Sequence, residues 1–260
     1  MDAIILCGGK GTRLSEETIE KPKPMVEIGG KPILWHIMKI YSYFGVNRFI
    51  LALGYQGQQI KNYFYNYKVT NADFSLKLDP EKDIEYLNHS DEKNWEIVLV
   101  DTGEETLKGG RIKRVEEYIR SDIFHLTYGD GVCDIDLNKL VDYHKSHSCI
   151  GTVTAVRPPS RFGELSIDQD SSVLALEEKP QMGKGLINGG YFVFNKKILS
   201  YLKEDKDCDF EFGPLQKIAS EGQLKAFKHN GFWQCMDNIR ERDYLDKLVK
   251  TNDASWIKWK

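Results

Sequence analysis

The sequence lacks the marks of three large classes of protein. Its five cysteines are odd in number, scattered and without a C-x-x-C pair, which excludes a zinc motif of that type and a disulfide framework. No stretch approaches the ~20 apolar residues of a membrane span. The formal net charge of −3 leaves no basic excess for binding nucleic acids or membrane surfaces. We therefore expect a protein of the reducing cytoplasm with no nucleic-acid or membrane partner.

Internal repeats, low-complexity runs and linker-like stretches are also missing, so nothing in the pattern separates one unit from another. The N-terminus carries Asp2 and a short apolar run, which is not the pattern of a signal peptide. A length of 260 residues suits one large α/β domain. We predict a single domain over residues 1–260, in which residues 1–135 and 136–260 differ in character.

The first half alternates strands with helices. Apolar runs and helical spacing predict strands at 3–7, 48–52, 95–100 and 123–127, and helices at 33–44, 58–67 and 112–120. Such alternation predicts an α/β fold with a Rossmann-like, doubly wound, mostly parallel sheet. Ligands of these sheets bind beyond the carboxyl ends of the strands, which is where residues 8–13 and 128–131 fall.

The second half changes to strands at short spacing. They are predicted at residues 150–156, 163–167, 173–178 and 190–194. We expect them as antiparallel additions to the same sheet. Beyond them, Trp256 and Trp259 are expected to dock the C-terminal tail or an interface.

Glycines follow the first predicted strand directly, in the segment Gly8-Gly9-Lys10-Gly11-Thr12-Arg13. Glycine lets the main chain approach a ligand closely, so several backbone N–H groups can point into one concavity. Lys10 and Arg13 add cationic donors for phosphate oxygens. The spacing is neither that of the dinucleotide fingerprint nor that of the P-loop, and a plain tight turn is the alternative.

A stiff basic segment lies one loop further along. It reads Lys21-Pro22-Lys23-Pro24-Met25, and Gly29-Gly30-Lys31-Pro32 then opens a predicted helix. Pro22 and Pro24 restrict the backbone, so Lys23 cannot easily fold away from the glycine-rich segment. The two segments together favour a polyphosphate site over a plain turn.

These strings carry a resemblance to a known family. Together they resemble the signature of the sugar-1-phosphate nucleotidylyltransferases, and the resemblance runs nearly end to end. The matching strings are Gly-Gly-Lys-Gly-Thr-Arg-Leu, Lys-Pro-Lys-Pro-Met and Gly-Gly-Lys-Pro-Ile. The segment from Asp101 to Arg111 is similar to the cytidylyltransferase branch. The resemblance implies transfer of the CMP moiety of CTP to α-D-glucose 1-phosphate, giving CDP-glucose and pyrophosphate. It also implies a homo-oligomer, which is a hexamer in related enzymes.

The resemblance further implies that the first half binds the nucleotide and the second half the sugar phosphate. Arg13 and Lys23 are the implied catalytic residues, with Arg13 on the β- and γ-phosphates and Lys23 on the α-phosphate. Thr106 and Arg111 are candidate contacts for the base or ribose. The full implied nucleotide site is Leu6, Gly8, Gly9, Lys10, Gly11, Thr12, Arg13, Lys23, Thr106, Arg111, Tyr128 and Gly129.

Two aspartates follow predicted strands and are candidate metal ligands. Asp130 lies between two glycines, and Asp237 follows the aromatic-rich residues 232–236. Carboxylates at one crevice suit Mg²⁺, which takes one or two of them together with phosphate oxygens. The alternatives are a Gly-Asp-Gly turn for Asp130 and a helix cap for Asp237. The resemblance implies that both bind Mg²⁺, whereas Asp134 and Asp136 are expected to start the next helix.

The acceptor site depends on the resemblance. By themselves, residues 177–180 favour an exposed charged turn. The matching family motifs imply a sugar-phosphate site formed by Gly163, Glu178, Lys179, Asn188 and Gly189. Two departures lie near this end: Asn238 stands where these enzymes usually carry threonine, and residues 208–215 differ from the expected Trp-Glu-x-Glu-Pro-Leu.

Two other functions stay open at this point. The chain is alternatively a cytidylyltransferase for a different phosphorylated acceptor, or a nucleotide-sensing domain without turnover. The joint presence of Arg13, Lys23, Asp130, Asp237 and Lys179 speaks against a sensor. No histidine shows a paired spacing, so none is given a chemical role, and Cys7 is expected to be a small buried residue.

Overall fold

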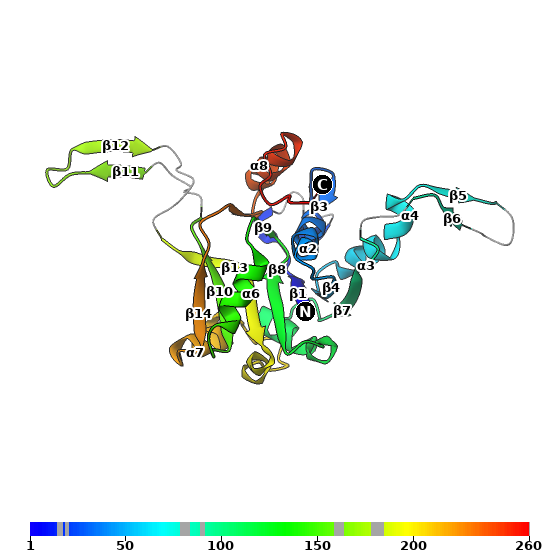
Figure 1. The fold of residues 1–260 in the computed structure, drawn as a ribbon, viewed down its shortest axis with the longest axis horizontal. Coiled ribbons are helices and arrows are strands. Elements are labelled where there is room, and N and C mark those ends of the chain that lie inside the picture. Colours follow the sequence, from blue (N-terminus) through cyan, green and yellow to red (C-terminus); the bar gives the residue numbers. More distant parts are fainter. Residues whose placement is uncertain are drawn as a thin grey trace.

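One seven-stranded sheet organises the computed structural model of the chain (Figure 1). The structure describes residues 1–14, 18, 21–78, 84–88, 92–158, 164–177 and 185–259, with the backbone alone at 13, 164–167, 176 and 177. In spatial order the strands are β14 (Leu224–Lys228), β10 (Gly151–Val156), β13 (Ile187–Asn195), β8 (Ile123–Tyr128), β1 (Asp2–Cys7), β4 (Arg48–Leu53) and β7 (Glu96–Asp101).

The direction of the strands confirms the predicted fold class. β1 pairs in parallel with β4 and β8, β4 with β7, and β10 with β14. Only β13 runs antiparallel to its neighbours, β8 and β10. The sheet is therefore mostly parallel with an antiparallel insertion in its second half, as the sequence predicted.

β1 is buried on both faces, which explains its apolar run. Ile5 and Cys7 belong to the core on one face, and Ile4 and Leu6 to the core on the other. Burial on both faces is characteristic of strands in parallel sheets covered by helices. Cys7 is 0% exposed and confirms the prediction of a small buried residue.

Helices cover both faces of the sheet. α2 packs on the face of Ile5, and α5 packs on the face of Ile4. The α-helices are α2 (Ile33–Tyr43), α3 (Gly57–Tyr65), α4 (Tyr67–Asn71), α5 (Lys108–Arg114), α6 (Leu137–Lys145), α7 (Gln216–Ser220) and α8 (Ile239–Lys250); short turns are η1 (Thr12–Leu14), η2 (Lys23–Met25), η3 (Glu116–Tyr118), η4 (Lys196–Tyr201) and the π-helical η5 (Glu211–Leu215). None of the helices in the described part of the chain combines the length and apolar character needed to cross a membrane.

The prediction of a helix at 112–120 placed its start too late. α5 begins at Lys108 and includes Gly109 and Gly110, which intrinsic propensity disfavours in a helix. Packing explains the difference, because a Cβ at Gly109 would lie 2.7 Å from the carbonyl oxygen of Cys208, and one at Gly110 would lie 2.3 Å from that of Asp205. The close approach of another segment therefore requires these glycines inside the helix.

Two of the strands predicted for the main sheet lie outside it. β11 (Glu164–Ile167) and β12 (Val173–Glu177) pair only with each other, and their hairpin projects from one side of the molecule in Figure 1. β5 (Phe74–Leu76) and β6 (Ile84–Tyr86) form a second projecting hairpin on the opposite side. Two small pairs remain, β2 (Glu27–Ile28) with β3 (Lys31–Pro32), and β9 (Gly131–Cys133) with β15 (Trp233–Cys235). The apolar pattern identified β11 and β12 as strands but not their partners.

The C-terminal tail docks into the core, as expected from its tryptophans. Trp256 is 1% exposed and stacks on Phe232 with ring centroids 5.2 Å apart. Its indole Nε1 donates a hydrogen bond to Nδ1 of His36 at 3.5 Å, while Nε2 of His36 bonds the carbonyl oxygen of Ile28 at 2.9 Å. The tail therefore completes the side of the core that contains α2.

Candidate functional site

A cleft of about 480 Å³ opens at the carboxyl ends of β1 and β8. Parallel strands present their backbone termini and loops at this edge, where ligands of such sheets bind. Fourteen residues of the predicted site line the cleft: Leu6, Gly8, Gly9, Gly11, Thr12, Lys23, Thr106, Arg111, Tyr128, Gly129, Asp130, Asn188, Gly189 and Asp237. The fold therefore brings residues from distant parts of the chain to one cavity.

Four predicted residues cannot be placed in the same way. Gly163, Glu178 and Lys179 lie outside the described residues, and the side chain of Arg13 is not described. Lys10 is described but does not line the cleft; its ammonium pairs with the exposed carboxylate of Glu105 at 2.6 Å. Their roles remain predictions.

The glycine-rich loop closes one side of the cleft. Gly11 has φ +63, a conformation that side chains rarely adopt, and its carbonyl oxygen accepts from the backbone N–H of Leu14 at 2.8 Å as the η1 turn begins. Gly8 accepts from the N–H of Tyr55 at 3.2 Å. The loop is thus tied both to its own turn and to the end of β4.

Arg111 is the internal support of this loop. It is 4% exposed, and its two terminal nitrogens donate to the carbonyl oxygens of Leu53, Gly8, Gly103 and Glu104 and to the hydroxyl of Thr102, at 2.7–2.9 Å. Burial is the largest cause that lowers the pKa of this guanidinium. The family resemblance made Arg111 a candidate contact for the base or ribose. The N–H groups of both terminal nitrogens, however, already donate hydrogen bonds to the chain itself.

The floor of the cleft holds a lysine between two carboxylates. Lys23 Nζ lies 2.6 Å from Asp130 Oδ2 and 2.6 Å from Asp237 Oδ1. Their side chains are 11%, 30% and 13% exposed. Burial alone would lower the pKa of Lys23, but the charges and hydrogen bonds of Asp130 and Asp237 raise it above its ordinary value. The three groups form one compact charged cluster.

The local backbone explains how these three side chains meet. Pro22 and Pro24 flank Lys23, the first residue of the η2 turn. Pro22 lies just before the turn in an extended conformation, with φ −66 and ψ 147. Asp130 follows β8, and the N–H of Met236 donates to the Asp130 carbonyl oxygen at 2.8 Å, which sets Asp237 beside it. Sequence segments more than a hundred residues apart thereby converge.

Asp237 does not cap the final helix. The N-cap of α8 is Asn238, whose side chain accepts from the N–H of Glu241 at 3.0 Å. Asparagine and threonine both serve as N-caps, so the departure at this position preserves the cap. The alternative role for Asp237 is therefore wrong, and its carboxylate faces the cleft. Asp136, in contrast, does cap α6 as expected, with the N–H of Lys139 donating at 3.1 Å.

The carboxylates of Asp130 and Asp237 fit a hard divalent cation. Each already approaches a single positively charged atom at 2.6 Å, so both reach one point from neighbouring strand ends. Carboxylate oxygens are the preferred protein ligands of Mg²⁺. The arrangement is chemically able to hold such an ion once Lys23 has another partner.

Another part of the cleft wall is a polar network around Tyr128. Its hydroxyl donates to Glu211 Oε1 at 2.7 Å and accepts from Asn188 Nδ2 at 3.1 Å. Burial and then the Glu211 charge raise the pKa of Tyr128 well above its usual range. Gly190, at φ +78, leaves room for the ring, because a Cβ there would lie 2.6 Å from Tyr128 Cδ2.

The lining residues that the predicted site did not include are Cys7, Pro24, Leu107, Lys108, Thr127, Gly131, Gly190, Tyr191, Trp233 and Cys235. Trp233 donates its indole N–H to the carbonyl oxygen of Gly189 at 2.7 Å. A signal for Trp233 and Cys235 existed, since alternate residues of a strand share a face and Asp237 follows at the same spacing. Lys108 lies within the segment already singled out, but nothing in its type marks it as part of a cleft.

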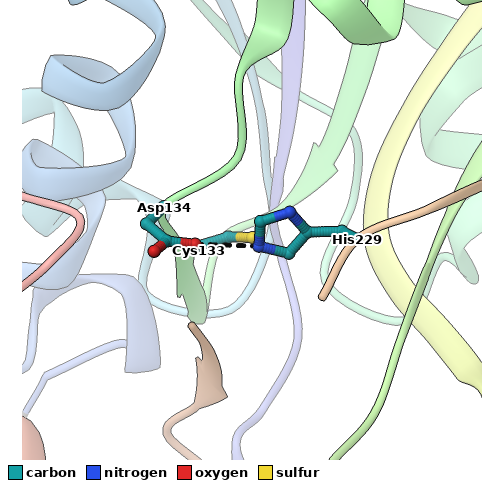
Figure 2. Close-up of side chains that lie close together, drawn as sticks. All are labelled: Cys133, Asp134 and His229. Carbon is teal, nitrogen blue, oxygen red and sulfur yellow. Dashed lines mark hydrogen bonds and ion pairs between the residues drawn. The ribbon is translucent and has the colours of Figure 1, made fainter. Parts of the chain in front are cut away.

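A separate cluster joins β9 to the segment before β15. Figure 2 shows Cys133, Asp134 and His229 together, with donor atoms within 4.8 Å of one another. His229 Nε2 bonds Asp134 Oδ1 at 2.8 Å, and burial raises the pKa of the Cys133 thiol, which keeps it protonated. Asp134 therefore anchors His229 and does not start the next helix.

Comparisons with known proteins find relatives over nearly the whole chain. The family model described as nucleotidyl transferase matches residues 2–241. The chain is 48% identical over 260 residues to the glucose-1-phosphate cytidylyltransferase of Salmonella typhi and 43% identical over 260 residues to the "Probable glucose-1-phosphate cytidylyltransferase" of Bacillus subtilis, with 100% of each chain covered. It is also similar to the crystal structure of HddC from Yersinia pseudotuberculosis, with a TM-score of 0.68, 28% identity, and coverage of 95% of this chain and 98% of that one.

Proposed function

Because this chain belongs to the nucleotidyl transferase family, we propose that it transfers the CMP moiety of CTP to α-D-glucose 1-phosphate. The products are CDP-glucose and pyrophosphate. The observation that carries nucleotidyl transfer is the meeting of Lys23, Asp130 and Asp237 beside a glycine-rich loop. The choice of cytosine and glucose is supported by the full-length similarity to the relatives.

The reaction is a substitution at the α-phosphorus of CTP. A phosphate oxygen of the sugar phosphate attacks in line and forms the new P–O bond, while the bond to the β-phosphate breaks and pyrophosphate leaves. Such transfers depend on positioning and on stabilising negative charge, so no protein nucleophile is required. Backbone N–H groups of residues 8–12 and the side chain of Arg13 are proposed to hold the β- and γ-phosphates.

Lys23 is proposed to change partners during this reaction. Its ammonium is neutralised by Asp130 and Asp237 in the structure described here. The arriving α-phosphate offers the lysine new oxygens, and negative charge grows there in the transition state. Asp130 and Asp237 would hold Mg²⁺, which when bound supplies positive charge to phosphate oxygens. The two carboxylates thus exchange one cationic partner for another.

Arg111 is proposed to act on the nucleotide through the shape of its pocket. Its hydrogen bonds join the glycine loop to residues 102–104, and they would thereby fix the shape of the cavity that receives the base. Thr106 lines the same region; its hydroxyl accepts from Arg114 at 3.0 Å and keeps its own proton available for the base or ribose.

The sugar phosphate is proposed to bind against the other wall. Asn188 and Gly189 line the cleft there, and the family motif implies that Gly163, Glu178 and Lys179 join them. Lys179 would position the attacking phosphate, and Glu178 would bind a sugar hydroxyl. In this proposal, the half formed by residues 1–135 binds CTP and the half formed by residues 136–260 binds the acceptor.

A screen of pyrophosphate release tests the function. Nucleoside triphosphates are combined with sugar 1-phosphates and Mg²⁺, and the fastest release is expected for CTP with α-D-glucose 1-phosphate. Comparable or faster turnover with UTP, dTTP or ATP would contradict the base assignment. A faster acceptor than glucose 1-phosphate would replace the sugar, and no release from any pair would favour a nucleotide sensor.

The remaining parts of the proposal concern the state of the protein in the cell. We propose a homo-oligomer, a hexamer by resemblance, located in the cytoplasm. Support comes from the family resemblance and, for a reducing compartment, from the five cysteines, all of which are unpaired thiols.

A further inference from the structure

We propose that Lys108 is a further binding residue for the sugar phosphate and that Glu211 positions it. This inference rests on the proposed function and adds a cation that the family motifs do not include. Lys108 is the first residue of α5, and it lines the cleft. Glu211 comes from η5, in the segment 208–215 where the sequence departs from the family pattern.

Two contacts hold the Lys108 ammonium at the cleft wall. Lys108 Nζ pairs with Glu211 Oε1 and lies 4.9 Å from the centroid of the Tyr128 ring. The same carboxylate oxygen accepts from the Tyr128 hydroxyl at 2.7 Å. Glu211 is itself oriented by the helix start, where Asp209 Oδ1 accepts from the N–H of Glu211 at 2.9 Å. The lysine is therefore held by an oriented carboxylate and an aromatic face.

Lys108 and Tyr128 come from the half of the chain that is proposed to bind CTP, but a hydrogen-bonded network joins them to the acceptor side. From Tyr128 the hydrogen bonds continue to Asn188 Nδ2, and Asn188 Oδ1 accepts from the N–H of Gly190 at 2.9 Å. Asn188 belongs to the proposed sugar-phosphate wall. On the nucleotide side, both terminal nitrogens of Arg111 already donate to the chain. Through Glu211 and Tyr128, Lys108 is thus connected to Asn188 on the proposed acceptor wall.

The chemistry of the acceptor suits such a residue. A phosphate monoester carries a charge of about −1.5 to −2 at neutral pH, with several strong acceptor oxygens. An ammonium has three N–H donors, so a contact with Glu211 leaves others for the phosphate. The Lys108 side chain is 49% exposed, against 24% for Glu211, so the ammonium is the more accessible member of the pair.

An exposed ion pair without function is the competing explanation, because such pairs contribute little to stability. The two explanations differ in kinetics. If Lys108 binds the acceptor, Lys108→Ala raises KM for α-D-glucose 1-phosphate by about tenfold and leaves KM for CTP within about twofold. Lys108→Arg keeps the charge and recovers most of the affinity.

A matched control comes from the same helix. Lys113 pairs with Glu116 at 2.5 Å and does not line the cleft. Lys113→Ala should leave both KM values unchanged. For the positioning role, Glu211→Gln keeps a hydrogen-bonding group beside Tyr128 but removes the charge, so its effect on the acceptor KM should not add to that of Lys108→Ala. Additive effects would overturn the role of Glu211.

The experiment is pyrophosphate release with each substrate varied in turn, for the full-length wild type and these variants, with melting temperatures measured in parallel. An unchanged acceptor KM in Lys108→Ala, or a larger rise in KM for CTP, overturns the inference alone. A wild type that releases no pyrophosphate from CTP and α-D-glucose 1-phosphate overturns the proposed function, and the inference with it.

Discussion

At the scale of single residues, Lys23 is the most informative side chain of the cleft. Its ammonium neutralises two carboxylates that lie beside each other, Asp130 and Asp237. Two such charges without a cation would repel each other in a partly buried site. Lys23 therefore stabilises the metal-free protein as well as taking part in the proposed chemistry.

The first prediction follows from this double role. Lys23→Met should lower the free energy of unfolding by about 1–3 kcal/mol in the presence of EDTA, since it leaves two partly buried carboxylates without this partner. Mg²⁺ should recover more stability in this variant than in the wild type, because the competing ammonium is gone. Turnover should fall roughly ten- to a hundredfold.

Denaturation with and without Mg²⁺ checks this prediction. Lys139→Met is the control, because Lys139 is 76% exposed and its ammonium lies 3.8 Å from the Asp136 carboxylate. Its stability should change little in either condition. Equal stability of Lys23→Met and the wild type in EDTA would show that the carboxylates do not need the lysine.

Two adjacent glycines give a second prediction at this scale. A Cβ at Gly8 would lie 2.1 Å from Arg111 Nη1, whereas a Cβ at Gly9 meets nothing within 4 Å. Gly8→Ala should therefore lower the free energy of unfolding by about 1–3 kcal/mol, as overpacking does, and displace the arginine that supports the loop. Gly9→Ala should not destabilise the protein. Urea denaturation distinguishes them, and equal stability of both variants would contradict the packing argument.

At the scale of elements, the docked C-terminal tail predicts a large effect of Trp256→Ala. Removal of a wholly buried tryptophan typically costs about 3–5 kcal/mol. Trp259 is only partly buried, so Trp259→Ala should cost less. Equilibrium denaturation in urea measures both. A loss below about 1 kcal/mol for Trp256→Ala would mean that the tail adds little to the core.

Asp2, at the start of β1, leads us to predict that stability depends on pH. Asp2 is 2% exposed and accepts from the N–H groups of Arg120 at 2.7 Å and Ser121 at 2.8 Å, and from Arg48 Nη1 at 2.9 Å. Burial raises the pKa of Asp2, but the hydrogen bonds and the Arg48 charge outweigh it and lower the pKa below its ordinary value of 3.8. The ionised carboxylate thus joins β1, β4 and the turn before β8.

The sign of the effect follows from the lowered pKa. The stabilisation is complete above the unfolded-state value of 3.8 and is lost as the pH falls from there through the folded-state value. Asp2→Asn should cost about 1.5–3 kcal/mol at pH 7. The gap between variant and wild type should close at pH below 3.8, as measured by urea denaturation. A gap that does not depend on pH would contradict the role of the charge.

At the scale of the whole molecule, the prediction concerns assembly. A hexamer of this chain has six times the mass of the 30.0 kDa subunit. Light scattering coupled to size-exclusion chromatography measures this mass for the full-length protein. A mass equal to one subunit would contradict the homo-oligomer that the family resemblance implies.

The order of elements and the position of the cleft could be predicted from the sequence. Apolar runs such as residues 3–7 are long enough to identify buried strands, and alternation with helices then determines a parallel sheet with its site at the carboxyl ends. Local motifs such as residues 8–13 and 21–25 identified the loops around the cleft, because glycine and proline act on the backbone where they stand.

Contacts between distant segments were decided only by the tertiary structure. Three such features have no signal in the local sequence. They are the pairing of Lys23 with Asp130 and Asp237, the hydrogen bonds of Arg111 to backbone carbonyls, and the separate hairpin of β11 and β12. Helix α5 begins at Lys108 despite two glycines, because residues 205–208 pack against them. Propensity and periodicity report the preferences of a residue with its neighbours along the chain, whereas these features depend on which remote groups the fold brings within a few ångströms.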